Sequence, residues 1–407
     1  MTTRLVLQQD ALREVLAVVT RASGKSSVSM YEMVRLDLLD SRLQLACFNG
    51  SFAAIGSLPV QVQANDQSLH GLGVYAETLK SLVNTIVGEI TLNTTEGGIQ
   101  IKNAANRSTL KTSAEIISIP PVPRVETPFV LPGKLVKDLV KVTSFALDDW
   151  SRPALNGVLL RTCSLAGNPV IEAQSADGIR LGRVIKRLEA SPPSPLDVLL
   201  PAAFVKMLGD IVQDSDTLCI FRERNTIFFQ LEGERRRFTL LALEIDSKYP
   251  DTSEIIRPPS RVEAEFVLNL QEAALAAKQV NIITRESSVQ AMFLKVQAGQ
   301  SEIRVASNEA ELGRTRRHLP AQNVAGNGWV WLQARVFAEI LSAMSSCRRL
   351  TVQLQGSFSP VHIKDEAGEF LAILMPLDIK EDPFEPQITT SAIPVDVHLA
   401  AAVPAAP

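Results

Sequence analysis

The chain has 407 residues and a mass of 44.3 kDa, which is enough for two or three domains that each bury their own core. Its 41 basic and 44 acidic residues leave a net charge of −3, which excludes a protein that holds nucleic acid by bulk positive charge, though not one with a basic face. No apolar run approaches the ~18 residues of a membrane helix, and the N-terminus becomes charged too early for a secretory signal. We therefore expect a cytoplasmic protein that does not bind membranes.

The cysteines and histidines are scattered along the chain. Neither residue type shows the short spacing of a zinc site, and no two cysteines form a CxxC pair. The sequence also lacks the GxxxxGK[ST], GxSxG and HExxH motifs. We therefore expect free thiols, no metal and no cofactor. The residues concerned are Cys47, Cys163, Cys219, Cys347, His70, His318, His362 and His398.

Three segments of the chain begin alike, at Thr3, Thr127 and Ala264, each with a short β-rich run followed by a helical stretch. Halfway through each unit a second strand-to-helix passage recurs: GVYAETLKSLVNTI, VLLPAAFVKMLGDIV and VWLQARVFAEILSAM. Apolar residues in these passages fall at i, i+3, i+4 and i+7, the spacing of one buried helix stripe. The three stripes are Leu79, Leu82, Val83 and Ile86; Phe204, Met207, Leu208 and Ile211; and Phe337, Ile340, Leu341 and Met344.

Alternating segments such as RLDLLDSRLQLACF separate the helices and predict antiparallel strands, and each unit closes on a further β-rich segment. Each unit is therefore predicted to be α+β, a β-α-β-β-β motif used twice. Proline-rich linkers place the units at residues 1–123, 124–260 and 261–379. Residues 380–407 are rich in proline and alanine without periodicity, and we expect a disordered tail.

Five short motifs follow one another in the order and spacing found in the bacterial DNA polymerase III β subunit, the sliding clamp family. The chain resembles that family over residues 1 to about 379. The motifs are SRPALNGVLL (151–160), SADGIRL (175–181), YPD (249–251), SPVHIKD (359–365) and LMPLDI (374–379).

The resemblance implies a head-to-tail homodimer, a six-domain ring with helices inside and sheets outside. Such a ring encircles duplex DNA without sequence specificity, is placed there by a clamp loader, and tethers replicative polymerase and repair proteins through short linear motifs. It is a processivity factor with no catalytic activity. By resemblance, the dimer contacts join the closing strand of the first unit to the region near 280–283 of the third.

The resemblance also implies a partner-peptide pocket between the second and third units. Its residues are mainly aliphatic with one methionine, which suits adaptable packing against several peptides, and Arg180 would be a polar anchor. Without the resemblance, most of them would be assigned to core packing. Ile179, Glu254 and Asp378 depart from the family pattern. The predicted pocket consists of Leu155, Ala176, Gly178, Ile179, Arg180, Leu181, Pro250, Ile255, Phe358, Pro360, Ile373, Leu374, Met375, Pro376 and Leu377.

Basic residues on the predicted helices are the candidates for DNA contact. Lys134, Lys137 and Lys141 are spaced i, i+3 and i+7, and Lys206 lies on the following helix. The alternative is that these lysines only solubilise helix surfaces. By resemblance, Lys25 and Arg152 match DNA-contacting positions. Where the family often carries basic pairs, this chain has Glu77, Thr78, Ala202 and Ala203, which predicts weaker contact or relocated basic residues.

Other functions remain open at this level. The sequence GLGVYA (71–76) fits the G-x-G-x-x-A fingerprint of dinucleotide sites, but its VYA aligns with strand ends in the other two units. A three-repeat scaffold that binds only proteins is the main alternative to a clamp, and an unrecognised α+β enzyme is a more distant one. The apolar tail sequence IPVDVHL (393–399) suggests competition for the peptide pocket.

Overall fold

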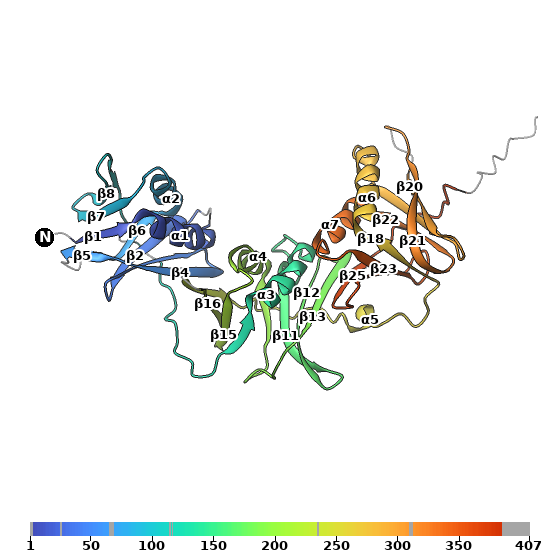
Figure 1. Cartoon of the computed structure of the whole chain (residues 1–407), viewed down its shortest axis with the longest axis horizontal. Coiled ribbons are helices and arrows are strands. Elements are labelled where there is room, and N and C mark those ends of the chain that lie inside the picture. Colours follow the sequence, from blue (N-terminus) through green and yellow to red (C-terminus); the bar gives the residue numbers. More distant parts are fainter. Residues whose placement is uncertain are drawn as a thin grey trace, which may run out of the picture.

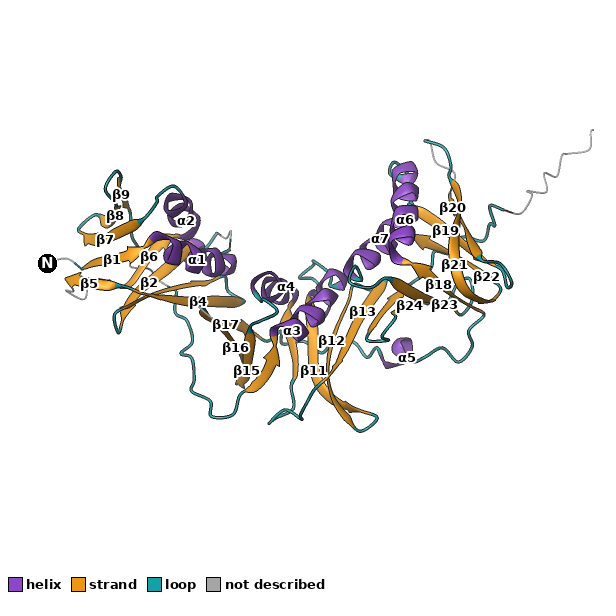
Figure 2. Ribbon diagram, in the orientation of Figure 1, coloured by secondary structure: helices purple, strands orange, loops and turns teal. Residues whose placement is uncertain are grey.

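The computed structural model describes residues 3–24, 27–64, 69–113, 115, 117–233, 236–308 and 312–384. Three units follow one another along an arc, with most helices on its concave side and the sheets on its convex side (Figures 1 and 2). Each unit contains the predicted β-α-β-β-β motif twice, so the repeat is confirmed. Lys25 and the IPVDVHL sequence lie outside the described residues.

The first unit adds one short strand, β5, to this pattern. Its elements are β1 (Arg4–Gln8), α1 (Gln9–Val19), η1 (Thr20–Ala22), η2 (Ser29–Glu32), β2 (Met33–Leu39), β3 (Arg42–Phe48), β4 (Phe52–Pro59), β5 (Gln61–Ala64), β6 (His70–Tyr75), α2 (Ala76–Asn84), β7 (Glu89–Thr95), β8 (Gly98–Lys102) and β9 (Arg107–Leu110).

The second unit continues its first helix as a 3-10 turn. Its elements are β10 (Phe129–Pro132), α3 (Gly133–Leu139), η3 (Val140–Phe145), η4 (Pro153–Asn156), β11 (Gly157–Leu165), β12 (Asn168–Ala176), β13 (Arg180–Arg187), β14 (Asp197–Pro201), α4 (Ala202–Ile211), β15 (Thr217–Glu223), β16 (Thr226–Glu232) and β17 (Arg237–Leu243).

The third unit follows a linker that contains the short helix α5 (Ser253–Ile256). Its elements are β18 (Ala264–Asn269), α6 (Leu270–Thr284), β19 (Ala291–Val296), β20 (Glu302–Ser307), β21 (Arg316–Gly326), β22 (Gly328–Gln333), α7 (Ala334–Ala343), β23 (Arg349–Leu354), β24 (Val361–Asp365) and β25 (Phe370–Leu374).

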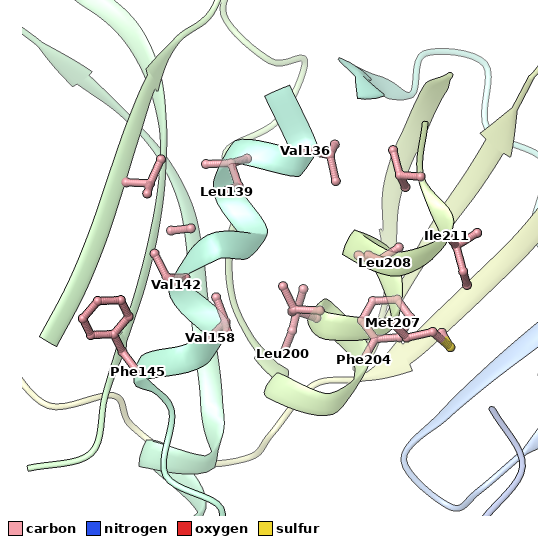
Figure 3. Close-up of a cluster of buried hydrophobic side chains, with 14 of the residues drawn as sticks. Val136, Leu139, Val142, Phe145, Val158, Leu200, Phe204, Met207, Leu208 and Ile211 are labelled. Carbon is pink, nitrogen blue, oxygen red and sulfur yellow. The ribbon is translucent and has the colours of Figure 1, made fainter. Parts of the chain in front are cut away.

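The predicted helix stripes form the core. All twelve stripe residues are buried except Leu82, which is half-buried. In the second unit, Val136 and Leu139 of α3 and Leu208 of α4 belong to one core cluster that fills the space between the helices, and Phe204 of α4 is buried in the same cluster (Figure 3). Because side chains of both helices fill this space, truncating a fully buried one such as Phe204 to alanine should cost about 3–5 kcal/mol.

The dinucleotide reading of residues 71–76 is wrong. Gly71 and Gly73 lie inside strand β6, where Gly73 is opposite Arg35 of the antiparallel neighbour β2, and α2 begins only at Ala76. A dinucleotide fingerprint needs its glycines in the loop between a strand and a helix of a parallel βαβ unit. The glycines therefore cannot cradle a pyrophosphate here.

Two sheets run across the boundaries between units. Residues 52–56 of β4 pair antiparallel with 238–242 of β17, which joins the first unit to the second. Residues 180–184 of β13 pair in the same way with 370–374 of β25, which joins the second unit to the third. Backbone hydrogen bonds therefore hold the three units together along the convex side.

The segment after each closing strand crosses the outer face of its own unit. In each unit it forms a backbone hydrogen bond to the strand before the second helix. The bonded pairs are Ser113 with Gly73, Ile245 with Leu199, and Leu377 with Trp331. In the third unit this segment continues past residue 379, where the sequence predicts a tail. Phe384 packs there with Leu377 and Ile379, so contacts with the third unit extend beyond residue 379.

Candidate functional site

The predicted peptide groove coincides with an apolar cluster, its floor, where the second and third units meet. Ala176, Leu181 and Ile373 form a small cluster at the ends of β12, β13 and β25, each no more than 9% exposed. Leu155 and Ile256 pack against it from η4 and α5. The pairing of β13 with β25 places Leu181 opposite Ile373, so the sheet that crosses the unit boundary builds the groove.

Exposed apolar side chains surround this floor. Ile179, Ile255 and Met375 are between 42% and 45% exposed, whereas Phe358, 50% exposed, has its ring 5.8 Å from that of Trp329 on the outer face of the third unit. The amide of Met375 donates to the carbonyl of Ile179 at 2.9 Å, which fixes two of these chains beside each other. Large, partly solvent-exposed apolar side chains around a buried apolar floor are typical of a surface that binds apolar groups of a partner.

Of the remaining predicted pocket residues, four lie in turns or at partly exposed positions and two lie away from the groove. Gly178, with φ +100, makes the turn between β12 and β13, and Pro250, Pro360 and Pro376 are half-buried or exposed. Two others lie away from the groove. Leu374 is 1% exposed within the main core, and Leu377 packs with Phe293 and Trp331 on the outer face of the third unit.

Arg180 is already engaged inside the protein. Its guanidinium bonds Asp177 at 2.9 Å and Glu339 of α7 at 2.6 Å, and it lies 5.7 Å from the centre of the Phe145 ring. The Arg180 side chain is only 12% exposed. Arg180 thus connects Asp177 of the second unit to Glu339 of the third.

Sequence reasoning missed Ile256 and Leu371. Both pack against the groove cluster, Ile256 from α5 and Leu371 from β25. Leu371 could have been found, because it lies two residues before Ile373 and a strand places such residues on one face. Ile256 required knowing that the linker folds back over the sheet.

The predicted DNA-contacting residues differ in how freely they are presented. Lys134, Arg152 and Lys206 are exposed. Lys137 forms an ion pair with Asp214 at 3.0 Å, and Lys141 bonds Asp138 at 2.5 Å and the Ser346 hydroxyl at 3.0 Å. The last two lysines therefore already have partners.

The concave face is close to charge balance. Each of α2, α4, α6 and α7 carries one basic and one acidic residue, and α1 carries one basic and two acidic ones. Among the helices that the structure describes, α3 together with the η3 turn has an excess of basic residues, while the single basic residue of η1, Arg21, forms an ion pair with Asp210. The excess that the sequence predicts for the inner helices is thus local to the second unit.

An ionic cluster joins the second and third units beside this face. Lys186 contacts Asp138 at 2.7 Å and Glu369 of the third unit at 2.6 Å. Burial alone would raise the pKa of Asp138, but hydrogen bonds from Lys141 and Lys186 outweigh it and lower that pKa below its usual value. Asp138 therefore remains ionised and keeps both lysines in place.

The described residues contain no group of three or more His, Cys, Asp or Glu side chains arranged to hold a metal ion. No helix in the described part of the chain is long and apolar enough to cross a membrane.

A scan against models of protein families finds no match. Among curated proteins, the chain is similar to the "Beta sliding clamp" of Treponema pallidum, with 25% identity over 330 residues that cover 78% of this chain and 83% of that protein. It is also similar to the "Beta sliding clamp" of Halalkalibacterium halodurans, with 22% identity over 211 residues, 51% of this chain and 52% of the relative.

Solved structures of sliding clamps share the fold. The DNA polymerase sliding clamp of Bacillus subtilis matches with a TM-score of 0.82 at 16% identity, and that of Bartonella birtlesii, solved bound to griselimycin, with 0.82 at 20%. Each match covers 93% of this chain and 100% of the other. The resemblance seen in the sequence is thus confirmed.

Proposed function

We propose that this chain, a relative of the bacterial β sliding clamps with their fold over nearly its whole described length, is a DNA polymerase processivity factor. Two copies would form a ring that encircles duplex DNA in the cytoplasm. The ring would tether replicative polymerase and repair proteins through the groove between the second and third units, and a clamp loader would place it on DNA. This role needs no catalytic group.

The observation that carries the proposal is a strand junction that occurs twice within the chain. The last of the four strands in one unit's first half pairs with the closing strand of the next unit, as β4 with β17 and β13 with β25. By the same rule, β21 of the third unit should pair with β9 of a first unit. Within the described residues, β9 pairs only with β8, and its other edge is unpaired. Residues 316–320 of β21 pair with β20 on one edge, and no described strand pairs with their opposite edge.

A second copy would supply both missing strands. Joining β21 of each chain to β9 of the other makes two equivalent heterologous contacts and closes a ring of six units, which leaves no open sheet edge at the junctions. The arc in Figure 1 curves toward the side that carries most of the helices, which would place them toward the centre of such a ring.

The modest charge of the concave face supports retention by enclosure. Each phosphate contact adds affinity and salt dependence, so a ring that slides needs few of them. Lys134, Lys206 and Arg152 are exposed and would make such contacts, while most helices are charge-balanced.

The experiment that tests the proposal has two parts. Native mass spectrometry should give about 89 kDa, twice 44.3 kDa. After loading by a clamp loader, the protein should stay on nicked circular DNA and run off the same DNA once it is linearised. A monomer would favour the protein-only scaffold, and equal release from both DNA forms would contradict enclosure.

A further inference from the structure

A cavity of about 690 Å³ lies on the outer face of the second unit, between its sheet and the linker that follows β17. Arg161 of β11 and Arg183 of β13 line it from the sheet, and Tyr249 and Thr252 line it from the linker. None of the roles described above uses these four side chains.

The sheet side of the cavity holds a buried charge cluster. Glu172 of β12 is 1% exposed and accepts hydrogen bonds from Arg161 at 3.0 Å and from Arg183 at 2.9 Å. The amide of Gln174 also donates to Glu172, and Thr252 donates to the oxygen of Gln174 at 2.9 Å. Two guanidinium groups therefore share this buried carboxylate.

Three buried donors around this cavity have no acceptor among the described residues. They are the Nε of Arg161, the Nε of Arg183 and the hydroxyl of Tyr249. Buried donors are normally satisfied, because leaving one unpaired costs the free energy of its lost hydration. Burial and the neighbouring Glu172 raise the pKa of Tyr249, so its hydroxyl stays protonated and can donate. The arrangement therefore suits an acceptor that carries negative charge.

The rim of the cavity limits how much charge that acceptor can bring. Asp197, Glu244 and Asp251 line it together with Lys248 and Arg257. Glu244 is paired with Arg222 and Arg257 with Glu254, both outside the cavity, so the rim has no basic excess. A doubly charged phosphate would meet these carboxylates, whereas a carboxylate brings one charge and two oxygens that accept several hydrogen bonds.

The cavity adjoins the groove on the same face of the sheet. Arg183 follows the groove residue Leu181 by two positions on β13, a step of about 6.6 Å along the strand. Strand pairing also places Arg183 opposite Gln174 on one side and Leu371 on the other. Ile256 lines the cavity and also packs against the groove cluster. A chain lying in the groove therefore passes within side-chain reach of the cavity.

We propose that the cavity receives the carboxylate of an aspartate or glutamate in the partner peptide while the apolar side chains of that peptide occupy the groove. This inference rests on the proposed function, since it names a feature of the partners that the groove selects. Arg183 and Tyr249 are specificity-determining residues for that carboxylate.

The test compares peptides that differ by one charge. The peptides are acetylated heptapeptides in which two fixed apolar residues occupy the groove. Each of the other positions in turn carries either Glu or Gln. Titration calorimetry measures the affinity of each peptide for the full chain. At one position the Glu peptide should bind about tenfold more tightly than its Gln partner, the range expected for a charge-assisted hydrogen bond. Tyr249→Phe should reduce this ratio about threefold, and Arg183→Gln should abolish it. The matched control Tyr75→Phe, at an exposed position in the first unit, should leave it unchanged.

The outcomes separate the inference from the proposed function. Equal affinity within every Glu and Gln pair, in peptides that do bind, would overturn the acidic site and leave the groove intact. Failure of all peptides to bind would contradict the groove itself and the inference with it. In a second measurement, sodium acetate is added while NMR follows the Arg Nε–H signals. Shifts of the Arg161 and Arg183 signals without discrimination between peptides would assign the cavity to free carboxylates and overturn the proposal.

Discussion

The aromatic ring of Phe384 contacts two arginines, with the Arg316 guanidinium 5.2 Å and that of Arg304 5.7 Å from its centre. Arg316 also donates to the carbonyl of Pro383, and Lys295 forms an ion pair with Asp382. These contacts hold residues 382–384 against β19, β20 and β21, which carry Lys295, Arg304 and Arg316. Arg316 begins β21, the strand whose edge the proposed ring uses, so the fastened segment lies beside that junction.

Removing this segment should destabilise the third unit. A chain ending at residue 379 should unfold at a lower temperature than one ending at 384, because it loses the Phe384 contacts and exposes Phe293 and Trp331. Phe384→Ala should cost about 1–2 kcal/mol, from two cation–π contacts and the lost ring burial. Thermal unfolding of the two truncated chains measures this. Identical midpoints would show that the segment adds nothing.

The groove should lose peptide affinity when its exposed rim is charged. Met375→Asp and Ile179→Asp should each weaken binding of an apolar peptide by tenfold or more, because a carboxylate there must be desolvated by the incoming apolar side chain. Titration calorimetry measures the affinity, and native mass checks that the assembly is intact. Val87→Asp is the control, since Val87 is 84% exposed and lies in the first unit. Unchanged affinity in both groove variants would place the peptide elsewhere.

DNA binding by the concave face should depend weakly on salt. Replacing Lys134 or Lys206 by glutamate should lower the slope of log affinity against log salt by about one for each lysine, because each contact releases about one counterion. Fluorescence anisotropy with a short duplex at several salt concentrations gives the slope. Arg237→Glu, on β17 and so within the sheet layer, should leave it unchanged. A slope insensitive to Lys134 and Lys206 would mean that they do not face DNA.

Stability should fall on mild acidification because of His362. Burial, helped by Lys364, lowers the pKa of this histidine below its ordinary value near 6.5, although a backbone hydrogen bond to Ile255 opposes the shift. As the pH drops below about 6.5, the unfolded chain binds a proton that the folded chain disfavours, so the free energy of unfolding decreases until the lowered pKa is reached.

Urea unfolding of wild type and His362→Gln between pH 7.5 and 5 tests this expectation. The wild type should lose stability more steeply over that interval than the variant. His318→Gln is the comparison, because His318 is exposed. Parallel curves for wild type and His362→Gln would show that this histidine does not contribute.

Periodicity in the sequence determined the repeat and its elements. Stripes such as Phe337, Ile340, Leu341 and Met344 need burial on one helix face whatever the neighbours are, so the pattern alone predicted them. The family motif SADGIRL (175–181) likewise predicted Leu181 as a pocket residue. These are local signals, because each depends on residues a few positions apart.

Features that depend on the pairing of strands distant in sequence could be seen only in the tertiary structure. Alternation along β25 places Ile373 and Leu374 on opposite faces, but only the pairing of β13 with β25 sets Leu181 opposite Ile373 and leaves Leu374 in the main core. The near-neutral charge of the sequence left open where basic residues gather, and folding pairs Lys137 with Asp214 and Lys186 with Glu369, which are distant in sequence. Because strand register and ion pairing join residues distant in sequence, the groove, the cavity beside it and the balanced concave face became visible only in the fold.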